Sequence, residues 1–153
     1  MFEIFWDELT GGLRDFVQFQ RIAVRMLAAM VMGGIVGIQR ERAGKAAGLR
    51  THMLVAIGSA MFVLSASSVG MALDEMSRVI QGVAAGIGFL GAGAILKLQE
   101  QRTIEGLTTA AAIWVTAAAG VAAGLGRVGL ALFGVVISWL VLSLLALIRP
   151  NAE

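Results

Sequence analysis

The 153-residue sequence contains no cysteine and a single histidine, His52. The absence of cysteine excludes a disulfide, a thiol nucleophile and a thiolate metal site. Lysine and arginine occur singly or in pairs along the chain, whereas a nucleic-acid-binding surface needs a basic patch or stripe. We therefore expect neither thiol chemistry nor nucleic-acid binding from this protein.

Charged residues are also scarce. They make up 14% of the sequence, whereas hydrophobic residues make up 58% and the mean hydropathy is +0.86. In an ordinary soluble domain, about a quarter of the residues are charged. A chain of 16.0 kDa cannot bury this much apolar surface in its own core, because small domains keep a large fraction of their surface in contact with water. The composition therefore predicts that lipid covers the chain.

Five apolar stretches are long enough to be membrane spans, since a helix needs about 20 apolar residues to cross roughly 30 Å of hydrocarbon. The connections between them are short, which makes successive helices antiparallel neighbours. The sequence predicts an all-α integral membrane protein, a five-span transmembrane helix bundle with glycine-rich packing over residues 22–149. The predicted spans are residues 22–38, 51–73, 79–96, 106–126 and 128–148.

The part before the first span, residues 1–21, is predicted to be an interfacial amphipathic segment. Its apolar residues, from Phe2 to Val17, recur at three- and four-residue spacing, which gives a helix one apolar face. More lysine and arginine lie in loops 39–50 and 97–105 and in the C-terminal tail than on the other side. The positive-inside rule then places the C-terminus in the cytoplasm and the N-terminus outside. We expect no soluble domain after the last span.

The 20 glycines of the chain gather in the apolar stretches, often four residues apart. That spacing puts two small residues on one helical face, where they let neighbouring membrane helices approach closely. The glycine-rich stretch GIGFLGAG in the third span leaves two interpretations open. It is either a closely packed helix or a break at membrane depth whose exposed carbonyls bind an ion or ligand. The candidate packing or backbone-site glycines are Gly33, Gly37, Gly82, Gly86, Gly88, Gly91 and Gly93.

Three stretches together resemble the membrane domain of MgtC/SapB family proteins. They read GGIVGIQRERAGKAAGLRTHMLVAIGSAMF, QGVAAGIGFLGAGAIL and EGLTTAAAIWVTAAAGVAAGLG, at residues 33–62, 81–96 and 105–126. The resemblance implies a bacterial inner-membrane protein with about five spans. Family members are associated with growth in low magnesium and with survival inside host cells, and some are thought to restrain the F-type ATP synthase.

The sequence departs from the family pattern in two ways. Many members carry a soluble C-terminal domain of the ACT type, whereas this chain stops at Glu153. The first loop of the family usually reads E-R-E, and here Gln39 replaces the leading glutamate. One carboxylate fewer weakens the case for a cation site in this loop.

Candidate functional residues flank the first loop. Arg40 and Glu41 end the first span, either as an anchor with a local ion pair or as a docking surface for an acidic or phosphorylated group. Arg50, Thr51 and His52 begin the second span. Thr51 is predicted to cap this helix, and the group forms either an anchor or a polar intramembrane network, which the resemblance favours. A lone histidine makes a poor metal site.

Two further groups lie at the ends of later spans. The first group flanks the start of the third span, and two interpretations of it are open: a solvated loop, or acidic residues that attract Mg²⁺ weakly. The second group begins the fourth span and serves either helix packing or a pore lined by Thr108, Thr109 and Gln81. The members of the two groups are Asp74, Arg78 and Gln81, and Glu105, Thr108, Thr109 and Trp114.

The function we expect is that of a non-enzymatic membrane protein without a cofactor, because no nucleophile–base pair or metal cluster presents itself. Its expected partners are the lipid bilayer and either another membrane protein or further copies of itself. No charged residue lies in the central third of any predicted span, where ion-coupled pumps usually need one. The alternative is an ion channel or magnesium transporter built around the glycine-rich third span.

Overall fold

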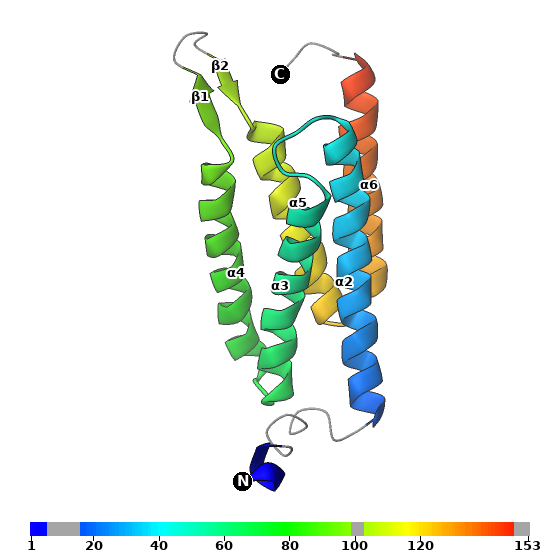
Figure 1. Ribbon diagram of the computed structural model, residues 1–153, viewed down its shortest axis with the longest axis vertical. Helices are drawn as coiled ribbons and strands as arrows, with labels where there is room; N and C mark the ends of the chain where they lie inside the picture. The colour runs from blue at the N-terminus through cyan, green and yellow to red at the C-terminus, as the bar shows by residue number, and fades with distance from the viewer. Residues whose placement is uncertain (6–15, 99–102, 149–153) are drawn as a thin grey trace.

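The computed structural model describes residues 1–5, 16–98 and 103–148, and Figure 1 shows their arrangement as a bundle of long antiparallel helices. Residues 2–5 form a helical turn at one end. The other helices and strands are α2 (Phe16–Arg42), α3 (Leu49–Ser68), α4 (Leu73–Gly93), β1 (Leu96–Leu98), β2 (Thr103–Glu105), α5 (Leu107–Gly124) and α6 (Val128–Ile148).

Glycine ends three of the helices in the same way. Gly44, Gly70 and Gly126 follow α2, α3 and α5 with φ of 67°, 75° and 77°. At each, the glycine N–H and the N–H of the next residue return to carbonyls of the last helical turn. This is the Schellman arrangement, which needs a left-handed residue and satisfies carbonyls that the helix leaves open. These turns begin the connections 43–48, 69–72 and 125–127, so the short connections predicted from the sequence are present.

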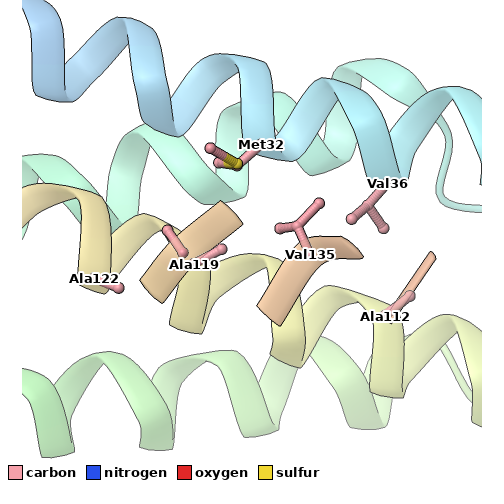
Figure 2. Packing of buried hydrophobic residues seen from close by; sticks show 7 residues of the cluster. Met32, Val36, Ala112, Ala119, Ala122 and Val135 are labelled. Atoms are coloured by element: carbon pink, nitrogen blue, oxygen red, sulfur yellow. The ribbon is translucent and has the colours of Figure 1, made fainter. Parts of the chain in front are cut away.

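The centre of the bundle is formed by α2, α3 and α5, with α6 packed on α2 and α5 and with α4 packed mainly on α5. Figure 2 shows the cluster where α2, α5 and α6 meet; Met32, Val36 and Val135 face small residues of α5 there. A second cluster between α2, α3 and α5 consists entirely of alanines: Ala29, Ala56, Ala60 and Ala123. Small side chains let the three helix backbones lie close together.

Glycines make the closest helix approaches. A Cβ added to Gly33 or Gly120 would overlap the backbone carbonyl of His52 or Ala56, respectively, on α3. A Cβ at Gly37 would lie 2.7 Å from the Cα of Leu49, also on α3. The α2–α3 and α3–α5 crossings therefore leave no room for a side chain at these positions.

The glycines of α4 behave differently. A Cβ at Gly82, Gly86, Gly88 or Gly93 would meet nothing within 4 Å, and only Gly91 lies near another helix, with its Cβ position 3.6 Å from that of Ala110. The predicted packing of Gly82 and Gly86 against a helix of the same chain is therefore not present among the described residues. The helix also runs without interruption to Gly93, so of the two interpretations left open for residues 86–93, the break at membrane depth is wrong.

The structure differs from the sequence-based boundaries at three places. Residues 74–78, predicted as a loop, belong to α4, and residues 16–21, predicted as part of the interfacial segment, are the first turns of α2. The predicted loop 97–105 contains an antiparallel hairpin that pairs Leu96 with Glu105. Strands of three residues are too short to produce a recognisable alternation. Residues 6–15, also assigned to the interfacial segment, lie outside the described residues.

Three of the helices are long and apolar enough to cross a membrane: Phe16–Arg42, Leu49–Ser68 and Leu107–Gly124. The described part of α6 includes a shorter apolar helix, Val128–Leu144. The helix α4 begins with Asp74, Glu75 and Arg78 in its first two turns, which lowers its hydropathy. The all-helical character of the predicted bundle is thus confirmed apart from the hairpin, with three candidate spans.

Candidate functional site

A buried arginine lies at the end of the bundle where α2 ends and α3 and α5 begin. Arg40, in the last turn of α2, is only 3% exposed. Its Nη2 donates a hydrogen bond to Oγ1 of Thr109 at 2.9 Å and a longer one to Oγ1 of Thr108 at 3.4 Å. Burying a guanidinium is costly unless hydrogen bonds replace its water. The two threonines supply such bonds and tie the end of α2 to the start of α5.

The histidine of the first-loop motif belongs to the same region. His52 is fully buried in α3, with 0% exposure, so it faces protein rather than lipid or water. Its Nδ1 lies 2.9 Å from the carbonyl oxygen of Gly48. Because a carbonyl can only accept, this contact assigns the proton to Nδ1 and leaves Nε2 as an acceptor. That buried Nε2 has no hydrogen-bond partner in the described part of the chain.

The neighbouring Glu41 caps α3 from across the loop. Its Oε2 accepts a hydrogen bond from the backbone N–H of Leu49 at 2.7 Å, and a carboxylate is favourable at the positive end of a helix dipole. The carboxylate lies close to Gly48, where an added Cβ would be 2.7 Å from the same oxygen. The helix begins at Leu49 with Gly48 as its N-cap, so the prediction that Thr51 caps it is wrong.

We call Arg40, Glu41, His52, Thr108 and Thr109 the Arg40 cluster. Beside it lies a cavity of about 390 Å³ between α3, α4 and α5. The hydroxyl-bearing residues Thr51 and Thr109 line this cavity, and its other walls are apolar. Arg50 lies in the first turn of α3 with an exposed side chain. The cavity therefore combines a few hydroxyl groups with apolar walls next to a fixed positive charge.

The structure does not bring together the residues of the pore that the sequence left as an alternative to helix packing. Thr108 and Thr109 lie in the first turn of α5, whereas Gln81 is exposed in the half of α4 nearer the opposite end of the bundle. Trp114 is 50% exposed and lines an apolar cavity of about 320 Å³ between α4, α5 and α6 rather than a glycine face. Glu105 is exposed and ends β2.

The acidic residues of the third span also act in a way that was not predicted. Asp74 and Glu75 lie in the first turn of α4 rather than in a solvated loop. Oε2 of Glu75 accepts a hydrogen bond from the N–H of Ala72 at 3.0 Å, which is half of a capping box. Arg78 follows in the next turn and is exposed. Among the residues with described coordinates, no group of three His, Cys, Asp or Glu could hold a metal ion.

Two important residues were not singled out from the sequence as site residues. Gly48 gives Glu41 access to α3, and Arg25 donates from Nη1 to the carbonyl oxygen of Gly124 at 3.0 Å. The only signal for Gly48 was its place directly before the LRTH string. A contact between residues as distant as Arg25 and Gly124 has no signature in a single sequence.

Apolar helices long enough to cross a bilayer, with a partly buried polar cluster at one end, define a helical membrane protein. The family model described as the MgtC family matches residues 26–150. The chain therefore belongs to the MgtC family, as the sequence motifs indicated.

Curated relatives support this membership. The chain is 45% identical over 133 residues to Protein SrpB of Synechococcus elongatus, covering 80% of this chain and 73% of SrpB. It is 43% identical over 129 residues to "Putative magnesium transporter YhiD" of Escherichia coli K12, covering 78% of this chain and 58% of YhiD. It is 43% identical over 104 residues to Protein MgtC of Salmonella typhimurium LT2, covering 68% of this chain and 43% of MgtC. No solved structure is significantly similar to this chain.

Proposed function

We propose that this protein acts in the bacterial inner membrane by lateral helix contact with another membrane protein, which it regulates during adaptation to low magnesium or host stress. Membership of the MgtC family supports this role, and the family resemblance makes the F-type ATP synthase the candidate target. The protein is not an enzyme in this proposal. The other candidate partner is a second copy of the chain.

The proposed topology has five spans, with the N-terminus outside and the C-terminus in the cytoplasm. It is supported by the antiparallel order of α2 to α6 (Figure 1). The excess of lysine and arginine in loops 39–50 and 97–105 supports the orientation. The Arg40 cluster then lies at the cytoplasmic surface, where it holds the first loop in one conformation.

The observation that carries the proposal is an open groove between α3 and α4. The groove has a volume of about 740 Å³, and Gly58, Gly82 and Gly86 line it. A Cβ at any of these three glycines would meet nothing within 4 Å. Ser59, which is buried, also borders the groove and adds a hydroxyl group to its apolar wall. In a membrane, small residues on an open face let another helix approach closely, and a hydroxyl there adds an interhelical hydrogen bond.

Co-reconstitution with a purified F-type ATP synthase tests this proposal. ATP-driven proton pumping into liposomes should fall when the protein is present. Gly86→Leu, which fills the groove, should abolish that inhibition. Gly88→Leu is the matched control, because Gly88 lies on the same exposed helix but does not line the groove. Unchanged pumping with the wild-type protein, or equal effects of the two variants, would contradict the proposal.

Magnesium transport is the alternative, and the name of YhiD favours it. It requires a path other than an unwound GIGFLGAG stretch, because α4 is helical there. Liposomes that contain this protein alone and a trapped magnesium indicator distinguish the two functions. Saturable Mg²⁺ entry above that of empty liposomes would favour transport, and regulation by contact predicts no such entry.

A further inference from the structure

Two arginines lie one turn apart on α2, at the end of the bundle opposite the Arg40 cluster. Arg25 is half-buried, and its Nη1 donates to the carbonyl oxygen of Gly124 at the end of α5. The guanidinium also lies against Gly126, where a Cβ would be 2.7 Å from Nη2. The negative end of the α5 dipole favours a cation at this place. Arg25 is therefore held in position by the protein rather than extended freely into solvent.

Hollows border this pair on both sides. One, of about 330 Å³, is lined by both arginines together with Gln18, Leu64, Ser67 and Ser68. The other, of about 310 Å³, is lined by the same two arginines together with Gln20 and Gly126. The first hollow thus has polar groups from α2 and from the end of α3, and one apolar wall.

Among the described residues, the charges in this place are not balanced. Arg21 and Arg25 are four residues apart on one helix, a spacing at which like charges repel. In the part of the chain that the structure describes, no acidic side chain lines either hollow, and Arg21 makes no hydrogen bond or ion pair. Each guanidinium has five N–H donors, and Arg25 uses one of them on Gly124. The pair therefore offers unused donors and net positive charge to an anion.

We propose that the hollow at Arg21 and Arg25 binds the phosphate group of an anionic phospholipid. Guanidinium groups match phosphate oxygens in a bidentate geometry. In the topology proposed above, on which this inference rests, this end of the helices lies at the level of the lipid headgroups. The exposed apolar side chains of Val17 and Val24 on α2 lie beside the pair and give the acyl chains a surface. A zwitterionic headgroup fits less well, because its cation would face two guanidinium groups, and no described carboxylate lines the hollow.

Lipid titration followed by native mass spectrometry of the full chain in neutral detergent tests the site. Phosphatidylglycerol should bind more tightly than phosphatidylcholine. Arg21→Gln should raise the apparent dissociation constant for phosphatidylglycerol about tenfold, which is the order expected for a lost hydrogen bond to a charged group. Arg78→Gln is the matched control, because it removes an exposed arginine near the same end that lines neither hollow.

Arg21→Gln should fold normally, since Arg21 has no partner in the described structure, and circular dichroism checks this directly. A change of less than twofold for Arg78→Gln completes the expected result. Equal losses for the two variants would mean general attraction to positive charge and would overturn the site. Equal affinity for phosphatidylcholine would overturn the preference for an anionic lipid. Competition by soluble glycerol phosphate at the affinity of the lipid would assign the pocket to a free phosphate instead.

Discussion

Two regions of this protein use glycine in opposite ways. Where α3 crosses α2 and α5, a side chain at Gly33 or Gly120 would overlap backbone atoms. Along α4, Gly82 and Gly86 open onto a groove, and a Cβ at either one would meet no described residue within 4 Å. The same four-residue spacing of small residues thus closes the bundle at one place and leaves an open face at the other. The spacing of small residues in the sequence indicates a helix face that another helix can approach closely. The structure shows whether a helix of the same chain already packs there.

The largest effect on stability is expected where α3 crosses α5. Gly120→Ala should destabilise the protein by about 3 kcal/mol, because the added Cβ overlaps the carbonyl of Ala56 and forces α3 and α5 apart. Chemical unfolding in detergent micelles, followed by circular dichroism, measures this change. A variant as stable as the wild type would show that the crossing is looser than described here.

A smaller effect is expected in the Arg40 cluster, which joins the same closed helices. Thr109→Val keeps the shape of the side chain but removes the hydroxyl that accepts from Arg40 at 2.9 Å. It should cost about 2 kcal/mol, since a buried charged donor loses the shorter of its two hydrogen bonds to α5. Thr51→Val, an exposed threonine at the same end, is the control and should change stability by less than about 0.5 kcal/mol. Equal effects of the two substitutions would show that the hydrogen bond between Arg40 and Thr109 does not stabilise the protein.

The smallest expected effect, of opposite sign, belongs to the open face. Gly82→Ala should stabilise the protein by about 0.5 kcal/mol, because alanine favours the helix and its methyl group meets open space. The same unfolding measurement as for Gly120→Ala compares the two regions directly. Destabilisation of Gly82→Ala would show that α4 packs more closely against α3 than the groove allows.

The candidate site was predictable in composition but not in detail. For the motif around residues 40–52 the sequence left an anchor or a polar network open, and the structure buries Arg40 and His52. The cap of α3 was assigned to Thr51, whereas Glu41 supplies it from α2. Capping rules consider the residue directly before the helix, and they do not include a carboxylate that arrives from another helix.

The helices and the membrane character of this protein were determined by the sequence itself. Long apolar runs interrupted by a few charges admit helical structure in lipid, because every backbone polar group must be satisfied within the segment. The tertiary structure alone decided which glycines are covered, that Arg40 reaches Thr109, and that Arg25 reaches Gly124. These facts depend on how the helices are rotated and placed against one another, and neighbours along the chain carry almost no information about that arrangement.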